Sequence, residues 1–467
     1  MKRYSYKSIV ILALLVLTLK SCFLAKEYEQ PKEFEPNESL FRTDNIQKDS
    51  TSIAEISWRD FFLDESLQKH IEEGLENSID IRIALNQILI ANAYAKEAKA
   101  GFFPEINFDG GVNYQNLASN SQFGGFFNSI TQYEADVNLS WEADIWGKIK
   151  SGQRAQQAAQ LQSIAAHQAV KTDLVANIAT TYFEITALDK QISITEKTIA
   201  TRQESYETAK ALKSSGQLTE VGVQQTKAQV HAAEAILIDL KNELRLAENR
   251  LSILKAIYPT QPERNSLDEI ELASGTSEGY PIQLLQNRPD VREAEQAFVN
   301  AFQLENVARA NLYPSLILNS SAGLQSLKFS DFISPNSFFY NAFGGVTQPI
   351  FNRRRLKTER EVAEIMKLQQ ALSFQQKVLQ AGQEVSDALY QVDMFGLKIE
   401  AKDKEFSAYE HAYEGAKELL INGLADYLEV LNAQENVLQT ELDLVQAKRD
   451  LFTSKVNLYR ALGGGWQ

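Results

Sequence analysis

The sequence has very few of the residues from which catalytic and metal sites are usually built. Cys22 is the only cysteine in 467 residues, which excludes an intramolecular disulfide and a cysteine-based zinc site. No histidine has the spacing of a metal ligand, and no glycine pair is followed by the lysine of a phosphate-binding loop. The four histidines lie far apart in helical stretches: His70, His167, His231 and His411. We therefore predict that the chain is not an enzyme and has no cofactor and no metal.

Long apolar runs are also missing. The longest, Ile9–Leu17, follows the basic residues Lys2, Arg3 and Lys7. A helix needs roughly 20 apolar residues to span a membrane, so this run is too short, and its basic flank is typical of a secretory signal peptide. We predict a signal peptide over residues 1–21 and no membrane-spanning helix after it.

The lone cysteine stands directly after this signal. Leu19-Lys20-Ser21-Cys22 resembles a bacterial lipobox, in which the cysteine is lipidated and becomes the first residue of the mature chain. Lys20 departs from the small or apolar residue usual there, and a plain cleaved signal with a chance cysteine is the alternative. If Cys22 is lipidated, the Pro/Glu-rich segment Lys26–Glu38 would be an extended tether.

The chain is acidic. Its formal charge is −14, and loss of the four Lys/Arg in residues 1–21 takes the mature chain to −18. Such a charge does not indicate a nucleic-acid partner. It fits either simple solubility or an acidic lumen.

Two segments of the sequence recur. Ala98-Lys-Ala-Gly-Phe-Phe-Pro104 parallels Ala308-Arg-Ala-Asn-Leu-Tyr-Pro314, and Tyr206-Glu-Thr-Ala-Lys-Ala-Leu parallels Tyr413-Glu-Gly-Ala-Lys-Glu-Leu. The two offsets are nearly equal, which indicates a duplication. We expect two similar halves after an N-terminal tail.

Each half combines long helices with short strands. Helical spacing of apolar residues covers 80–100, 151–213, 355–420 and 424–462. Between them, Ile106–Gln115 and Tyr133–Ile145 alternate strictly between apolar and polar residues, and 316–325 and 338–351 do so more weakly. Four such strands with aromatic residues near their ends are typical of membrane β-barrels. Because such barrels have at least about eight strands and must close, the sequence predicts an oligomer of unstated size.

Several motifs then indicate a family. Arg288-Pro-Asp-Val-Arg-Glu-Ala-Glu295, leading to the Ala308–Ser315 segment, resembles the most characteristic stretch of the outer-membrane efflux lipoproteins, the NodT-type subfamily of TolC-like channels. Trp58-Arg-Asp-Phe-Phe and Trp141-Glu-Ala-Asp-Ile-Trp-Gly-Lys-Ile are similar to two further family elements. The resemblance runs from about Cys22 to Leu462.

The resemblance implies a mostly α fold with transmembrane β-structure: a homotrimer with a long α-helical barrel and a shared 12-stranded β-barrel, four strands per protomer. It implies a lipid-anchored protein of the outer membrane that extends into the periplasm. Its partners would be outer-membrane lipid, a periplasmic adaptor (membrane fusion) protein and an inner-membrane resistance-nodulation-division transporter. The implied function is a passive exit duct of a tripartite efflux pump, with the exit channel of a type I protein-secretion system as the alternative. A structural coiled-coil lipoprotein is disfavoured by the amphipathic strands.

The resemblance also implies a periplasmic gate. Gly216 and Gly423 would turn the helices at the periplasmic tips, and acidic residues after the second turn would form the constriction. Asn432 stands where the family commonly has Asp, so Asp426 and Glu429 would carry the charge instead. The candidate gate residues are Asp426, Tyr427, Glu429 and Asn432.

We expect six segments in the chain: signal peptide 1–21, lipidated tether 22–60, first repeat 61–256 with strands 104–116 and 132–145, connecting segment 257–288, second repeat 289–462 with strands 314–326 and 338–351, and tail 463–467.

The intact mass of the mature protein tests the assignment of Cys22. We expect the mass of a chain that begins at Cys22 and carries acyl groups. Cys22→Ser should still insert into the membrane, because burial of the barrel is a larger anchor than acyl chains. A different first residue, or a mass without acyl groups, rules the assignment out.

Overall fold

The computed structural model describes residues 25–29, 56–120, 126, 128–273 and 288–467. Over these residues the chain is mostly helical, with one four-stranded sheet, in agreement with the predicted fold class. The chain divides into two compact units, one holding the sheet and the other most of the helical residues. Cys22 and most of the predicted tether lie outside the described residues.

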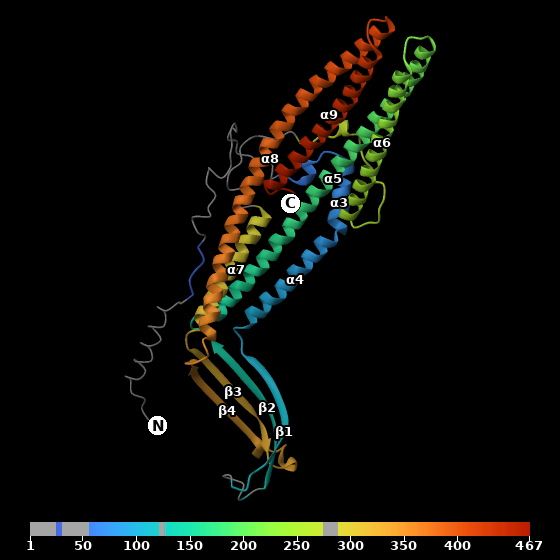
Figure 1. The fold of residues 1–467 in the computed structure, drawn as a ribbon. Coiled ribbons are helices and arrows are strands. Elements are labelled where there is room, and N and C mark those ends of the chain that lie inside the picture. The colour runs from blue at the N-terminus through green and yellow to red at the C-terminus, as the bar shows by residue number, and fades with distance from the viewer. Residues whose placement is uncertain (1–24, 30–55, 121–125, 127, 274–287) are drawn as a thin grey trace. The chain divides into compact units, whose positions relative to one another are not determined.

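The sheet joins the two halves of the chain. It consists of β1 (Glu105–Asn116), β2 (Ser129–Ala143), β3 (Ser315–Ser326) and β4 (Phe338–Thr347), antiparallel and in that spatial order (Figure 1). The register places Val137 of β2 opposite Phe108 of β1 and Ala322 of β3. Because facing residues share one side of a sheet, the alternation seen in each strand adds up to two distinct faces.

The strand ends differ from the sequence expectation for identifiable reasons. β1 and β3 begin one residue after the predicted 104 and 314, because both positions are prolines, which cannot donate to a ladder. β4 ends at Thr347 rather than 351, before Pro349. β2 begins at Ser129, which pairs with Asn116, and ends at Ala143.

Asp144, which the sequence placed in β2, has another role. Its carboxylate accepts hydrogen bonds from the backbone N–H groups of Ile149 (2.9 Å) and Lys150 (2.8 Å) in the first turn of the next helix. A helix N-terminus has unpaired N–H groups that such a carboxylate satisfies. The chain therefore leaves the sheet at Asp144 in order to start the helix.

The long helices come in matching pairs. α5 (Lys148–Ser214) and α8 (Arg355–Ile421) have 67 residues each, and α6 (Glu220–Leu254) and α9 (Tyr427–Ala461) have 35 each. α4 (Ile79–Ala100) and α7 (Pro289–Ala310) have 22 each. Equal lengths at corresponding places agree with the predicted duplication. Among the described residues, no helix combines the length and apolarity needed to cross a membrane.

In the helical unit, the Arg288-Pro-Asp motif connects three helices through hydrogen bonds. The buried Arg288 guanidinium donates to the carbonyl oxygen of Ala461 at the end of α9 (2.9 Å), to Asp290 (2.8 Å) and to Glu384 of α8 (2.8 Å). Burial alone would raise the pKa of the Asp290 carboxyl, but the hydrogen bond and charge of Arg288, together with Lys377, hold that pKa below its usual value. The motif thus ties the start of α7 to two other helices.

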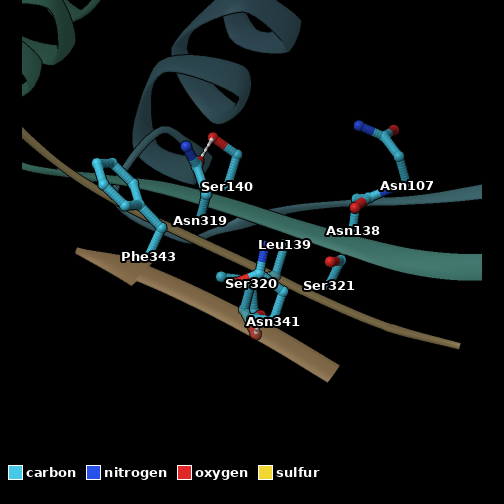
Figure 2. A pocket seen from close by; sticks show the side chains of 9 residues that line it. All are labelled: Asn107, Asn138, Leu139, Ser140, Asn319, Ser320, Ser321, Asn341 and Phe343. Carbon is cyan, nitrogen blue, oxygen red and sulfur yellow. Dashed lines mark hydrogen bonds between the residues drawn. The ribbon is translucent and has the colours of Figure 1, made fainter. Parts of the chain in front are cut away.

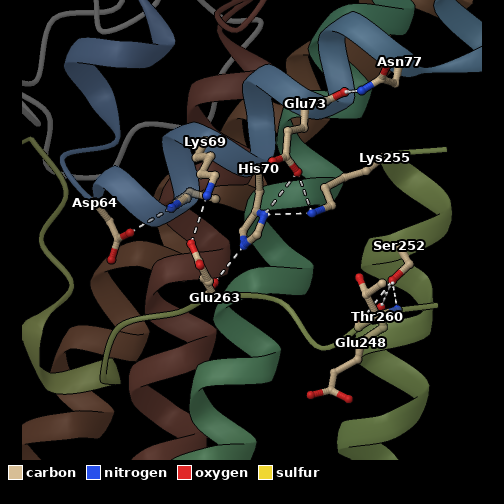
Figure 3. Close-up of polar contacts among 11 residues, drawn as sticks. Asp64, Lys69, His70, Glu73, Asn77, Glu248, Ser252, Lys255, Thr260 and Glu263 are labelled. Carbon is tan, nitrogen blue, oxygen red and sulfur yellow. Dashed lines mark hydrogen bonds and ion pairs between the residues drawn. The ribbon is translucent and has the colours of Figure 1, made fainter. Parts of the chain in front are cut away.

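A second buried network fastens the segment after α6 onto α3 (Glu65–Asn77) (Figure 3). His70 is 3% exposed, and its Nε2 lies 2.8 Å from the carbonyl oxygen of Glu263. Its Nδ1 lies 3.0 Å from the Nζ of Lys255, which also binds Glu73 at 2.8 Å. An imidazole between a carbonyl and an ammonium donates from Nε2 and accepts at Nδ1, so the neutral ring fits this site.

Protonation of His70 would disrupt this network. Burial lowers its pKa, the hydrogen bond to Glu263 opposes that effect, and the charge of Lys255 lowers the pKa further; Lys69 also lowers it, and Glu73 raises it. The unfolded chain therefore binds the proton more readily than the folded one. The contribution of His70 to the free energy of unfolding is therefore fully present above the ordinary histidine pKa of about 6.5. It is lost as the pH drops toward the lower pKa of the folded state.

We predict that replacing His70 removes part of this pH dependence. The unfolding temperature of the wild type should fall as the pH is lowered from about 6.5, and His70→Gln should show a shallower slope over that window. His231→Gln, at a side chain that is 61% exposed, is the matched control and should keep the wild-type slope. Equal slopes for wild type and His70→Gln would contradict the assignment.

Candidate functional site: a two-faced sheet and two helix tips

One face of the sheet is apolar and uncovered by the described residues. On β1 it carries Ile106, Phe108, Val112 and Tyr114, which are 63, 73, 62 and 65% exposed. The register continues the same face through β2, β3 and β4. Its apolar members there are Tyr133, Ala135, Val137, Leu139 and Trp141, then Leu316, Leu318, Ala322 and Leu324, then Phe338, Tyr340, Ala342 and Val346; Ser320 and Ser326 share the face. An apolar surface of this extent needs a non-aqueous partner.

The opposite face is polar. Asn138 bridges two aspartates that face each other across β1 and β2, donating to Asp109 at 2.8 Å and to Asp136 at 2.7 Å. Ser140 donates to Asn319 across β2 and β3 at 3.0 Å. Amides and hydroxyls from all four strands, together with the ring of Phe343, line a shallow depression here (Figure 2). A face of this composition is suited to water, which fits the alternation that the sequence predicted.

Both outer edges of the sheet are open. β1 pairs only with β2, and β4 pairs only with β3, within the described part of the chain. Each edge therefore presents a row of unpaired N–H and C=O groups, which is a template for another strand.

In the helical unit, the two halves turn in the same way. Gly216 (φ +78°) follows α5 and Gly423 (φ +70°) follows α8, in the left-handed region that favours glycine. After each, the next residue donates back across the turn: Gln217 N–H to Leu212 O and Leu424 N–H to Leu419 O, both at 2.9 Å. These are paired helix C-terminal motifs of one kind. The sequence located both turns correctly; that they are the periplasmic tips stays a prediction.

The residue three positions after each glycine caps the next helix. Thr219 accepts from Gly222 N–H at 3.3 Å, and Asp426 accepts from Leu428 N–H at 3.3 Å. Asp426 is thus the N-cap of α9, where a carboxylate is favoured by the helix dipole. Its proposed gate charge therefore sits at a fixed structural position.

The other candidate gate residues separate onto two sides of α9. Tyr427 is 4% exposed, and its hydroxyl donates to the carbonyl oxygen of Ser205 in α5 at 3.0 Å. Burial raises the pKa of that hydroxyl, and hydrogen bonds to Thr226 and Ser205 oppose the rise. Glu429 and Asn432 are exposed, one helical turn apart. Tyr427 thus holds α9 to α5, while Glu429 and Asn432 are free to face something else.

An ion pair that the sequence did not indicate holds α9 to α5 near Tyr427. The Arg202 side chain is 2% exposed and donates to Glu435 at 2.6 Å and to the carbonyl oxygen of Gln229 in α6 at 2.8 Å. The partners are 233 residues apart in the chain, and Arg202 lies in an ordinary polar stretch of α5. No local pattern could have revealed this contact. An apolar cluster of Ala209, Val223, Tyr427 and Leu431 adds to it.

Comparison with known proteins gives a consistent result. The family model described as "Outer membrane efflux protein" matches residues 70–254 and 281–464, once in each half. The cation efflux system protein CusC of Escherichia coli O157:H7 is 29% identical over 97% of both chains. The solvent efflux pump outer membrane protein SrpC of Pseudomonas putida is 28% identical over 99% of this chain and 98% of its own. A crystal structure of CusC, described in terms of transmembrane channel formation, matches with a TM-score of 0.84 and 27% identity, covering 95% of this chain and all of that one.

Removing the charge of Glu435 should loosen α9 from α5. In Glu435→Gln, the buried Arg202 guanidinium loses its counter-ion, which we expect to cost roughly 1–3 kcal/mol of local stability. Hydrogen–deuterium exchange of the amides in Tyr427–Leu438 should speed up accordingly. Glu207→Gln, at an exposed ion pair with Lys210, is the control and should leave exchange nearly unchanged. Unchanged exchange in Glu435→Gln would show that the ion pair does not hold α9.

Proposed function

Because the chain belongs to the outer membrane efflux protein family, we propose that it is the outer-membrane exit duct of a tripartite efflux pump. The observation that carries this proposal is the sheet: one face apolar and uncovered, the other polar, with both edges open. In lipid, the apolar face contacts acyl chains and the polar face lines a water-filled passage. The duct is passive, and we assign it no catalysis, cofactor or metal.

The need to close the sheet determines the oligomeric state. An open strand edge is not tolerated in the hydrocarbon region, so β4 of one copy pairs with β1 of the next. We propose three copies and a shared 12-stranded barrel, with the long helices forming an α-helical barrel. The four strands of the described residues support a barrel whose number of strands is a multiple of four, and the copy number of three is the one that the resemblance of the sequence implies.

The anchor and the partners follow from the same assignment. We propose that Cys22 is lipidated and that the protein extends from the outer membrane into the periplasm. An adaptor (membrane fusion) protein and an inner-membrane resistance-nodulation-division transporter complete the pump. Residues just after the cysteine are already docked: the amide of Asn306 in α7 donates to the carbonyl oxygen of Lys26 (3.0 Å), and Tyr28 packs edge-on against Phe298 and Phe302. These contacts place residues 25–29 against α7.

The cargo belongs to the small molecules rather than to secreted proteins. The two relatives described above are named for efflux, of cations in one case and solvents in the other. Both export systems would use the same duct, so the names of the relatives, rather than the fold, favour efflux over type I secretion.

We propose that the second helix turn forms the gate. Asp426 is the N-cap of α9, Glu429 lies in its first turn, and Asn432 follows one turn later. Three copies that converge on an axis would bring six carboxylates together. Like charges at close range repel, so closure depends on contacts such as Tyr427–Ser205 and on cations that offset the charge. The turns at Gly216 and Gly423 would be the periplasmic tips.

Planar-bilayer recordings test both the duct and the gate. The wild type should conduct weakly and prefer cations, and this preference should fade as added salt screens the charge. Asp426→Asn/Glu429→Gln keeps a good N-cap and removes both charges, so cation preference should drop. Asn432→Asp should raise it.

Glu220→Gln is the control for these recordings, because it removes an acid from the first-half turn. If the double variant keeps wild-type selectivity while Glu220→Gln changes it, the gate lies at the first turn. If neither the wild type nor any variant conducts, the proposed function as an exit duct is contradicted.

A further inference from the structure

The connection between β3 and β4 exposes large apolar side chains. It lies at the end of the sheet opposite the ends that continue into α7 and α8 (Figure 1). Leu327, Phe329 and Ile333 are 61, 72 and 88% exposed there. Only two charged residues, Lys328 and Asp331, interrupt the segment from Ser326 to Phe338, and their charges cancel.

This connection has a defined conformation of its own. It contains two short 3₁₀ turns, η6 (Phe329–Asp331) and η7 (Pro335–Ser337). The Ser337 hydroxyl donates to the carbonyl oxygen of Asp331 at 2.6 Å, and the Ser326 hydroxyl donates to that of Lys328 at 2.9 Å. The backbone is thus satisfied locally, while the apolar side chains are left outside. Ser337 is buried, while Leu327, Phe329 and Ile333 are exposed, which is the reverse of what a water-facing loop needs.

The exposed side chains continue the apolar face of the sheet. The ring of Phe329 packs against Tyr133, with centroids 5.4 Å apart, and Phe332 stacks on Phe329 at 6.5 Å. Tyr133 belongs to the apolar face and pairs with Ser326, the last residue of β3. The connection therefore folds toward the apolar side of the sheet and not toward its polar side.

A neighbouring copy is poorly placed to cover this surface. Copies of the chain join through the outer edges of β1 and β4, whereas Tyr133 and Phe329 lie over β2 and β3, the two inner strands. What meets the apolar face of inner strands is lipid.

We propose that the connection between β3 and β4 is a lipid-binding wedge, whose Leu327, Phe329 and Ile333 side chains insert into the outer leaflet of the membrane. The proposal rests on the proposed function, since it requires the sheet to be in a bilayer. Aromatic and aliphatic side chains at the bilayer boundary gain from burial in acyl chains, while Lys328 and Asp331 remain at the headgroups. The wedge fixes the depth at which the barrel sits.

Tryptophan scanning in vesicles tests the wedge. The full chain with Trp141→Phe, which removes a tryptophan from the apolar face, serves as the background. This background keeps Trp58, Trp146 and Trp466, and its signal is subtracted. One further tryptophan is introduced as Phe329→Trp or Ile333→Trp, and each protein is reconstituted into phosphatidylcholine vesicles with or without brominated acyl chains. Val137→Trp, in the middle of the apolar face, reports insertion of the sheet. Gln325→Trp is the matched control, because Gln325 pairs with Glu134 on the polar face at the same end of β3.

We expect brominated lipid to reduce the fluorescence of Phe329→Trp and Ile333→Trp about as strongly as that of Val137→Trp, with blue-shifted emission, and to leave Gln325→Trp at background. If Val137→Trp is quenched and both wedge variants behave like Gln325→Trp, the connection does not insert into lipid. The proposed function as an exit duct is then unaffected. If Val137→Trp is not quenched either, the proposed membrane sheet fails and the wedge fails with it.

Discussion

The structure depends on one constraint: a strand edge in lipid must be paired. The sheet of this chain leaves the edges of β1 and β4 open and exposes an apolar face that water would not favour. A single copy therefore cannot be the functional unit. The polar face with Asp109, Asp136 and Asn138 becomes a channel lining only when further copies close the sheet around it.

Duplication supplies both halves with the same parts and lets one half specialise. Each half has helices of 22, 67 and 35 residues and a glycine turn followed three residues later by an N-cap. The position that is Gly222 in the first half corresponds to Glu429 in the second, by the offset between Gly216 and Gly423. The first turn has one acid, Glu220, whereas the second has Asp426 and Glu429, next to the Tyr427 contact that holds α9 in place. This difference between the two turns is the basis of the proposed gate.

Much of this could be predicted from the sequence, because it is written in short-range patterns. Alternation in Tyr133–Ile145 gave the two faces of β2, and Gly216 and Gly423 marked the turns. Strand ends were predicted less accurately, because single residues decide them: Asp144 caps the next helix instead of extending β2, and β4 ends before Pro349. The Arg202–Glu435 and His70–Lys255 contacts join residues 233 and 185 positions apart, which no pattern in the chain encodes. Long-range polar contacts needed the structure.

Closure of the sheet between copies is the central claim, and native mass spectrometry of the detergent-solubilised protein tests it most directly. We expect a single species of three chains, in which four strands from each copy complete one barrel. A monodisperse monomer, with the edges of β1 and β4 left unpaired, would contradict it.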